Sequence, residues 1–333
     1  MKIYYFKEDV RNVTETYYDI ILNSLRRNGY TVIAIETCTW KSVRIIKKED
    51  YILATRLGRF WLLYYLCGFR NFIFWFQGIT PEEVYMTYHK KWMYWIFSFL
   101  EKLAIKTSKY KISVSKYIFK HFENKYKINL DYNKLFIMPC FNSEFNSASF
   151  LTNNKYKKNI FCYAGGLQVW QGFEDILNIY KKIEEKYNNT FFKIYSKELD
   201  KAKSIVKQSG IKNYSIECVP NEKMQEALSD CKFGFIIREN NTVNNVATPT
   251  KLGTYIGNGV IPIMNKTIYA FNDMCDSYQY IINTNLDDPC SKIESYLDDI
   301  DQQKIYNEFK QFYDTFYNKE KYIKELQNYL IIE

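Results

Sequence analysis

Short apolar runs alternate with amphipathic segments along most of the 333-residue chain. The run MKIYYF, a helical pattern over 13–28 and the run YTVIAIE predict a strand, a helix and a second strand. RNFIFWFQGITPEE predicts a further buried strand and a turn, followed by a long helix through about residue 107. KISVS and KLFIMPCF predict two more strands, with a helix over KYIFKHFENKY between them. This alternation is typical of a doubly wound α/β domain.

Residues 142–158 are polar and unpatterned, which indicates a linker, and the alternation then restarts. Four further apolar runs, NIFCYAGG, TFFKIYS, YSIECVP and FGFIIRE, predict strands, with amphipathic helices between them. The pattern weakens after VIPIM, and residues 302–330 predict one long terminal helix. We therefore expect two Rossmann-like domains, spanning 1–150 and 151–333, with a C-terminal helix.

Composition and charge narrow the class of protein. Hydrophobic residues make up 47% of the chain, enough for sizeable cores. Its eight cysteines form no Cys-x-x-Cys pair, which favours reduced thiols in the cytoplasm over disulfides or a metal site. The start of the chain does not read as a signal peptide, and its most apolar run, FWLLYYLCGF, is too short to cross a bilayer. A cytoplasmic protein is expected.

The positive charge is concentrated in the first half of the chain. Lysine plus arginine exceed aspartate plus glutamate by 23 to 13 over 1–150, whereas the counts are 23 and 24 over 151–333. Residues 88–127, which mix lysine with aromatic residues, fit an anionic membrane surface, and the protein could be peripheral on the inner face of the cell membrane. Alternatively, Trp92, Trp95, Phe99 and Leu103 form an ordinary core stripe. Nucleic-acid binding lacks an accompanying motif.

Candidate chemistry lies in FGFIIRENNTVNNVATPTKLGTYIGNGVIPIM, residues 233–264. Arg238 directly follows a predicted strand, so it is expected at the carboxyl edge of the sheet, where α/β proteins bind ligands. Thr248 and Pro249 predict a helix start, with Lys251 in the first turn. Two cations and a helix start suit a diphosphate.

A glycine turn points to the same edge of the sheet. Gly165 and Gly166 follow a predicted strand and precede a helix, which allows close approach of a phosphate to the backbone. The dinucleotide fingerprint and the Gly-Lys-Ser/Thr phosphate loop are both absent, which disfavours nicotinamide-dependent and ATP-hydrolysing enzymes.

The segments YAGGLQVWQGF, CVPNEKMQEALSDCKFGFIIRE and NNVATPTKLGTYIGNGVIPI together resemble the nucleotide-sugar half of family 4 glycosyltransferases. FWFQGITPEE and KISVSKYIFKHFENKY are similar to elements of the other half in bacterial members. The resemblance implies the GT-B fold, with two Rossmann-like domains facing across a cleft. The amino-terminal domain would bind the acceptor and the carboxyl-terminal domain the donor.

The resemblance also implies roles for individual residues. Arg238 and Lys251 would hold the donor diphosphate and stabilise its charge as the sugar leaves, and a phosphate oxygen would take the acceptor proton. Further donor contacts are expected from Gly165, Gly166, Gln171, Val219, Pro220, Thr250 and Thr254. Glu82 and Glu83 could orient the acceptor, although a helix start would explain both. His89 and His121 are interpreted as structural residues without obvious partners.

The sequence departs from the family at two acidic positions. Family members carry two glutamates around the last helix of the site, and here Val246 and Thr254 occupy those positions. Glu239 is a candidate replacement for one of them. Gln171 stands where the family has a basic residue.

The resulting hypothesis is a retaining, metal-independent hexosyltransferase of surface-polysaccharide biosynthesis. Its donor would be a nucleotide-diphosphate sugar, with UDP as the expected nucleotide, and no cofactor is expected. Its acceptor would be a glycan or a polyprenyl-linked sugar. The alternative is a non-catalytic glycosyltransferase-like subunit that acts through a partner or the membrane.

Overall fold

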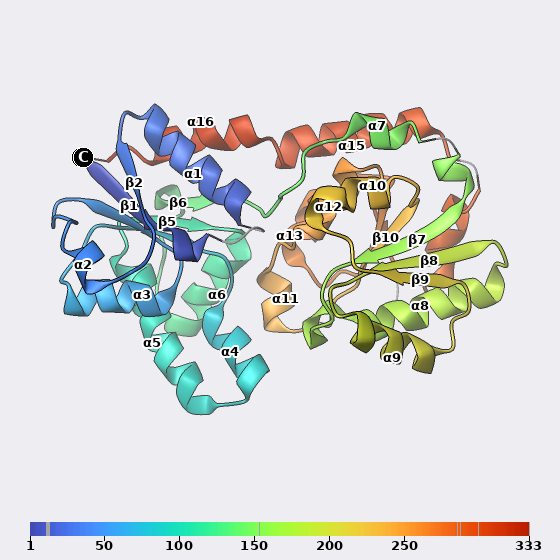
Figure 1. Ribbon diagram of the computed structural model, residues 1–333, viewed down its shortest axis with the longest axis horizontal. Helices are drawn as coiled ribbons and strands as arrows, with labels where there is room; N and C mark the ends of the chain where they lie inside the picture. The colour runs from blue at the N-terminus through green and yellow to red at the C-terminus, as the bar shows by residue number, and fades with distance from the viewer. Residues whose placement is uncertain (11–13, 153, 285, 287, 299, 333) are drawn as a thin grey trace. The chain divides into compact units, whose positions relative to one another are not determined.

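The computed structural model describes residues 1–10, 14–152, 154–284, 286, 288–298 and 300–332. Two compact units form the chain. The first contains Met1–Asn142, Asn245–Thr248 and Asn318–Glu333, and the second contains Ser143–Asn244 and Pro249–Tyr317. Both chain ends therefore belong to the first unit (Figure 1).

The first unit is built on a six-stranded parallel sheet of order β2-β1-β3-β4-β5-β6. Its strands are β1 (Lys2–Phe6), β2 (Thr31–Ile35), β3 (Tyr51–Ala54), β4 (Phe72–Phe76), β5 (Tyr110–Ser113) and β6 (Leu135–Ile137). Its helices are α1 (Glu15–Arg27), α2 (Trp40–Val43), α3 (Leu57–Trp61), α4 (Thr80–Tyr88), α5 (Lys91–Thr107), α6 (Lys116–Tyr126) and α16 (Lys319–Tyr329). Strand β4, FIFWF, is buried at every position, as expected of a strand covered on both faces.

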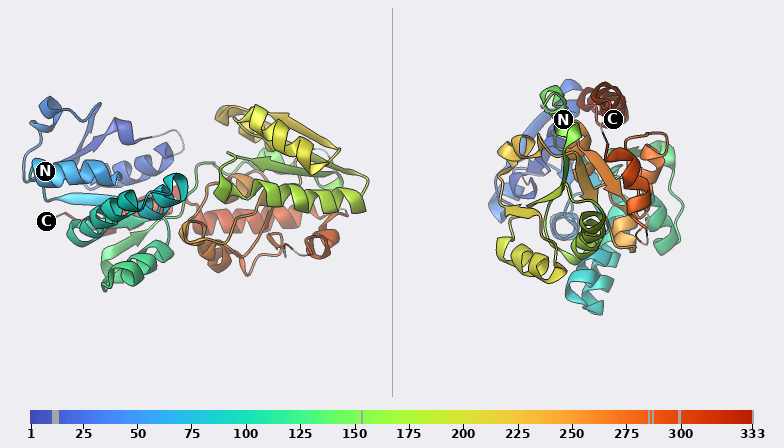
Figure 2. Two further views of the ribbon diagram at one scale, coloured as in Figure 1. Left: turned by 90° about the horizontal axis from the view of Figure 1, so that it is seen from below. Right: turned by 90° about the vertical axis from the view of Figure 1, so that its right-hand side faces the viewer.

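The second unit has a six-stranded parallel sheet of order β12-β11-β10-β7-β8-β9. Its strands are β7 (Asn159–Ala164), β8 (Thr190–Tyr195), β9 (Tyr214–Glu217), β10 (Phe233–Ile236), β11 (Ile261–Met264) and β12 (Ile282–Asn283). Its helices are α7 (Ser147–Phe150), α8 (Phe173–Lys186), α9 (Leu199–Ser209), α10 (Met224–Leu228), α12 (Lys251–Gly257), α13 (Tyr269–Cys275), α14 (Cys290–Ile293) and α15 (Gln302–Phe316). The short helix α11 (Thr242–Val246) runs into the segment that belongs to the first unit. Helices cover both faces of each sheet (Figures 1 and 2), so the prediction of two doubly wound α/β units is confirmed.

Two predicted long helices are each broken in two. The helix expected after β4 through residue 107 stops at Tyr88, because His89 takes a left-handed conformation with φ of 53°, and resumes as α5. The terminal helix expected over 302–330 divides into α15 and α16. Asn318 caps α16, since its side-chain oxygen accepts a hydrogen bond from Lys321 N at 3.1 Å. Helix α16 then packs on α1 within the first unit.

Helix α5 buries two polar residues beside three apolar ones, Leu100, Ala104 and Ile105. Glu101 and Ser98 are buried, whereas Trp92, Trp95 and Phe99 are 61%, 69% and 56% exposed. The alternative interpretation of these aromatic residues as a core stripe is therefore wrong.

A buried polar cluster explains why Glu101 is tolerated. Its carboxylate accepts hydrogen bonds from Tyr126 Oη at 2.6 Å and from Lys125 Nζ at 3.3 Å. Lys125 also lies 2.9 Å from Glu82 Oε1, and His121 Nε2 lies 3.2 Å from the same oxygen. His121 thus has a carboxylate partner, contrary to the prediction. The cluster links α4, α5 and α6 through charge-assisted hydrogen bonds.

A glycine in β10 sets the depth at which α12 packs. A Cβ atom on Gly234 would lie 2.6 Å from Cε2 of the buried Tyr255 ring. The hydroxyl of Tyr255 accepts a hydrogen bond from Ala164 N at the end of β7, at 3.1 Å. The ring therefore fills the space that a side chain at position 234 would occupy, and it ties α12 to two strands.

We expect Gly234→Ala to destabilise the second unit by about 2 kcal/mol, because an added methyl group overpacks the space against Tyr255. The denaturant midpoint of urea unfolding measures the effect. Gly58→Ala is the matched control, since nothing lies within 4 Å of a Cβ atom there. An equal midpoint for the two variants would contradict the proposed packing constraint.

Glu101 makes stability depend on pH. Burial raises the pKa of Glu101 to about 7. Since the folded pKa exceeds the unfolded value, this carboxyl contributes stability below about pH 4 that is lost as the pH rises through about 7. The loss in the free energy of unfolding is on the order of 3 kcal/mol. We expect it to be smaller in Glu101→Gln, whose amide oxygen still accepts a hydrogen bond from Tyr126. Denaturant midpoints between pH 4 and 8 (roughly the titration window) test it. Unchanged pH dependence in the variant would refute the assignment, and Glu49→Gln, at an exposed position, serves as the control.

Candidate functional site

The second sheet has a topological switch point between β7 and β10. Strand β7 pairs with β8 on one side and with β10 on the other, so the connections that leave the two central strands run in opposite directions. Ligands of doubly wound domains bind at the carboxyl ends of the strands at such a point. Gly165 and Gly166 follow β7 here, and Arg238 lies two residues beyond β10.

Arg238 is held at this edge by its backbone and its side chain. Its amide donates to Asn265 Oδ1 at 3.1 Å, and its Nη1 donates to the carbonyl of Trp170 at 3.3 Å. The side chain is buried, and burial lowers the pKa of Arg238 to about 10. No carboxylate within the described residues forms an ion pair with it.

Lys251 is the first residue of α12 and lies beside the same turn. Its Nζ donates to Gln171 Oε1 at 2.8 Å and lies 4.0 Å from the centre of the Tyr163 ring. Burial and the charge of Arg238 hold the pKa of Lys251 well below its usual range. As with Arg238, no carboxylate in the described part of the chain pairs with it. Two like charges therefore lie close together without a counter-ion among the described residues of the unit, an arrangement suited to an anion that carries two charges.

Two glycines bring the surrounding backbone close to these cations. A Cβ atom on Gly165 would lie 2.6 Å from Lys251 Cε. Gly172, which precedes α8, has φ of 61°, and a Cβ atom there would lie 2.8 Å from the carbonyl oxygen of Ile237. The turn between β7 and α8 is thus pressed against the side chain of Lys251 and against the backbone that precedes Arg238, and larger residues would separate them.

The interaction that fixes this turn was not predicted from the sequence. The carbonyl of Trp170 accepts a hydrogen bond from Asn244 Nδ2 at 3.1 Å as well as from Arg238. Asn244 also donates to the carbonyl of Glu239 at 2.9 Å. The only available signal was the row of asparagines after Arg238, and nothing in it distinguishes Asn244 from its neighbours.

The predicted helix start at Thr248 is wrong by two residues. Helix α12 begins at Lys251, after Thr250, which makes no side-chain cap. Thr248 belongs to the first unit, where its hydroxyl accepts from Cys140 N at 3.1 Å and donates to the carbonyl of Val114 at 3.4 Å. These hydrogen bonds attach the segment Asn245–Thr248 to the first unit, so the hydroxyl of Thr248 does not cap α12.

The remaining donor candidates have other contacts in the second unit. The hydroxyl of Thr254 donates to the carbonyl of Thr250 at 3.2 Å and lies 3.1 Å from Ser143 Oγ. Glu239 is exposed, and its carboxylate accepts from Asn241 Nδ2 at 3.3 Å. Val219 and Pro220 follow β9, which is the edge strand of the sheet. Of the predicted donor residues, Gln171 and Gly165 lie against Lys251.

The two positions that are acidic in the resembled family differ in their surroundings. Thr254 lies one turn beyond Thr250 in α12. Val246 is buried in the first unit, where its carbonyl accepts from Ser115 Oγ at 2.5 Å.

Of the two candidate acceptor residues in the first unit, Glu82 is already engaged. Its carboxylate contacts His121 and Lys125, and Tyr94 Oη donates to it at 3.4 Å. Burial opposes ionisation, yet the hydrogen bonds from His121 and Lys125 outweigh it, so the pKa of Glu82 lies below its usual value. Glu83 lies in the same first turn of α4, against Gly78. Glu82 is thus a member of the buried cluster that also contains Glu101.

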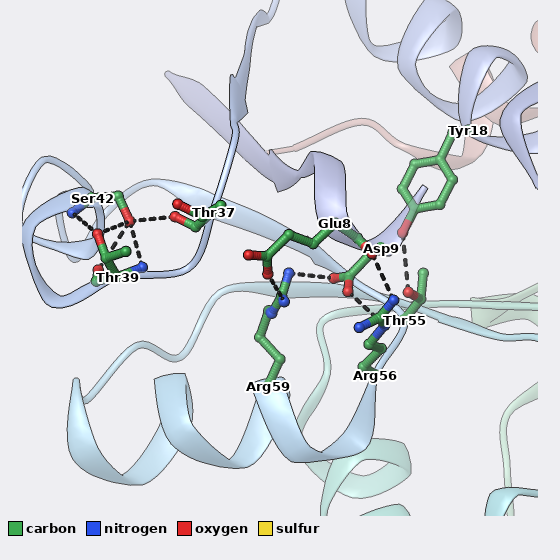
Figure 3. A network of polar contacts seen from close by, with 9 residues as sticks. All are labelled: Glu8, Asp9, Tyr18, Thr37, Thr39, Ser42, Thr55, Arg56 and Arg59. Atoms are coloured by element: carbon green, nitrogen blue, oxygen red, sulfur yellow. Dashed lines mark hydrogen bonds and ion pairs between the residues drawn. The ribbon is translucent and has the colours of Figure 1, made fainter. Parts of the chain in front are cut away.

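The first unit has a pocket at the switch point of its own sheet, between β1 and β3. Figure 3 shows its charged side chains: Asp9 lies 2.8 Å from Arg56 Nε and 3.0 Å from Arg59 Nη1, and Arg59 also contacts Glu8. A cavity of about 570 Å³ adjoins them. Its lining includes Glu8, Cys38, Arg56, Arg59, Thr80 and Phe97. These residues were missed because β3 was not predicted, so the residues that follow it were not assigned to a sheet edge.

No metal-ligand cluster of histidine, cysteine and acidic residues occurs among the described residues. All eight cysteines are free thiols. Across the described chain, no helix combines the length and the apolar character needed to cross a bilayer.

Comparisons with known proteins place the fold. No protein-family model matches the sequence, and no curated protein matches it. The chain is similar in structure to HepE of Anabaena, solved with UDP and glucose, at a TM-score of 0.68 and 10% identity, covering 99% of each chain. It is similar to a glycosyltransferase of Rickettsia africae at a TM-score of 0.64 and 13% identity, covering 100% of this chain and 99% of the other.

A third similar structure is a mutant of TarM of S. aureus, in complex with fondaparinux, α-GlcNAc-glycerol and UDP, at a TM-score of 0.64 and 13% identity. The match covers 87% of this chain and 57% of TarM, so the chain corresponds to little more than half of that protein. The two sheets and the terminal helices thus confirm the predicted GT-B fold.

Proposed function

We propose that the chain is a retaining, metal-independent glycosyltransferase of the family 4 type. It transfers a hexose from a nucleotide-diphosphate donor to a glycan or lipid-linked acceptor in surface-polysaccharide synthesis. The observation that carries the proposal is the pair Arg238 and Lys251, held together without a carboxylate partner from the described residues at the switch point of the second sheet.

The donor diphosphate would lie between these two cations. Its negative charge would remove the repulsion between Arg238 and Lys251, and the backbone at Gly165 and Gly166 would approach it closely. Thr254 would contact the ribose, and Val219 and Pro220 the base, while Thr250 and Gln171 complete the donor contacts. UDP is the expected nucleotide, since it is the ligand bound to HepE and TarM in structures of the same fold.

Transfer requires stabilisation of the leaving group. The bond between the anomeric carbon and the diphosphate oxygen breaks, and the electron pair leaves with the nucleoside diphosphate. The acceptor hydroxyl oxygen forms the new bond on the same face of the sugar, and its proton passes to a donor phosphate oxygen. Arg238 and Lys251 act on the charge that develops on the departing oxygen. Together they supply the two positive charges that a divalent metal would otherwise provide.

The acceptor is proposed to bind the pocket of the first unit. Its lining includes Glu8, Arg56 and Arg59, and the buried Asp9 behind them compensates the second arginine, so the pocket offers hydrogen-bond donors and acceptors without a strong net field. Such a lining suits the hydroxyl groups of a neutral sugar. Glu82 is not required in this role because His121 and Lys125 contact its Oε1 and its Oε2 is buried.

A second candidate function is a non-catalytic subunit with the same fold. Val246 and Thr254 favour it, because neither can replace the carboxylates of the resembled family. The two cations oppose it, because a buried pair of like charges costs stability that an inactive site has no reason to retain.

The role of Arg238 and Lys251 in binding the donor is tested first, by measuring the melting temperature with and without UDP. We expect UDP to raise the melting temperature of the wild type, because a ligand of the folded state stabilises it. Lys251→Met is expected to abolish this shift while leaving the melting temperature of the free protein unchanged or higher, since it removes one of two repelling charges. Lys203→Met, at an exposed lysine of α9, is the control.

Thermal scanning with UDP, GDP, CDP, ADP and dTDP, without metal, checks the result. A lower melting temperature for Lys251→Met with the UDP shift retained would mean that Lys251 is a structural residue. If none of the five nucleotides shifts the melting temperature of the wild type, the result would support the non-catalytic subunit instead.

The ribose position offers a gain-of-function test. We expect Thr254→Glu to tighten UDP binding by about tenfold, because a carboxylate accepts two hydrogen bonds from the ribose hydroxyls where threonine offers one hydroxyl. Thr254→Gln controls for size without charge. Isothermal titration calorimetry measures the affinities, and equal or weaker binding by Thr254→Glu would remove Thr254 from the ribose site.

A further inference from the structure

Helix α5 carries an exposed apolar stripe. Trp92, Trp95, Ile96 and Phe99 recur at the spacing of one helical face, and each is at least half exposed. The opposite face packs inward and contains the buried Glu101. Because Lys125 and Tyr126 bind this carboxylate inside the unit, α5 cannot rotate to bury its tryptophans without exposing the partners of Glu101. The exposure of the stripe is therefore built into the fold.

A second apolar segment lies on a helix that packs against α5. Helix α3 packs against α5 and continues as a π-helical turn, Leu62–Leu66. Large apolar residues are exposed on this segment too: Trp61, Leu62, Tyr65 and Leu66. We call these four residues and the four of α5 the aromatic surface. The α4–α5 hairpin projects beyond the rest of the first unit (Figure 1), so α5 is accessible to an extended partner.

The charged residues of α5 and of its two ends are lysines, apart from the buried Glu101. Lys90 and Lys91 begin α5, and Lys102, Lys106 and Lys109 lie along it and beyond its end. Within the described chain, none of these five lysines forms an ion pair with a carboxylate. Glu101, the sole acidic residue in the sequence from 84 to 109, is buried. The surface thus combines large apolar side chains with uncompensated positive charge.

We propose that the aromatic surface docks the protein on an anionic lipid bilayer. Tryptophan and tyrosine rings suit the headgroup region, leucine and isoleucine insert below it, and the lysines contact lipid phosphates. Association with a second copy through this face would bring two sets of lysines together without exposed carboxylates to pair with them. Nucleic acid would use the lysines and the aromatic rings but gives no role to Leu62, Leu66 and Ile96. The inference does not depend on the proposed donor site.

Vesicle flotation of the full-length protein tests this proposal. We expect binding to vesicles of phosphatidylcholine mixed with phosphatidylglycerol, and weak binding to pure phosphatidylcholine. Replacing both Trp92 and Trp95 by alanine should lower the partition coefficient by about tenfold or more, because two large apolar side chains no longer insert. Both residues are exposed, so the fold should be unaffected.

Leu151→Ala is the matched control, because Leu151 is 72% exposed but belongs to the second unit. Lys90→Gln combined with Lys91→Gln should weaken binding to the anionic vesicles and reduce its salt dependence.

Three outcomes would overturn the proposal. The wild type could fail to float with anionic vesicles, or the double tryptophan variant could bind as well as Leu151→Ala. Alternatively, the wild type could self-associate without binding vesicles, and the double tryptophan variant could abolish this self-association. That last result would assign the surface to a second copy of the chain. Because the assay contains no nucleotide sugar, its outcome is separate from failure of the donor-site proposal.

Discussion

The ring of Tyr255 lies where a side chain at position 234 would otherwise stand, and its hydroxyl binds the amide of Ala164. This packing places α12 directly over β10 and β7, and it carries Lys251 to the turn that follows β7. Gly165 and Gly172 then let that turn approach both Lys251 and the backbone before Arg238. Three positions without side chains thus bring two cations together at one edge of a sheet. The site depends on close packing more than on any single polar contact.

Close packing also explains why the charges are costly. In water, Arg238 and Lys251 would repel one another weakly, but at a buried edge the repulsion is larger and solvation is lost. The lowered pKa values of both groups express that cost. A site that binds a doubly charged anion gains affinity from the same arrangement, because the ligand removes a repulsion as well as forming hydrogen bonds. Stability of the free protein and affinity for the ligand are expected to oppose one another here.

Sequence patterns predicted the elements whose signals are local. Long apolar strands such as FIFWF and FGFII were predicted in place, as were Arg238 and Lys251 near one sheet edge. Strand β3 was missed because four apolar residues followed by Thr55 and Arg56 give little periodic signal. Thr248 was assigned to a helix cap because the choice between a cap and a distant backbone partner, Cys140, depends on tertiary structure. The partner of His121 was missed for the same reason, since Glu82 lies 39 residues away.

For helix α5, the hydrophobic periodicity of the sequence does not predict which face of the helix is buried. A stripe of tryptophan and phenylalanine at helical spacing shows that one face is apolar, but not which face points inward. The buried partners of Glu101 decide that question, because an ionisable group without Lys125 and Tyr126 would be far costlier to bury than tryptophan is to expose. The polar cluster, together with the buried Leu100, Ala104 and Ile105, therefore selects the orientation of the helix, and the tryptophan stripe is left facing outward. A hydrophobic surface fixed in this way persists without a partner, which is what a surface for reversible association with a membrane requires.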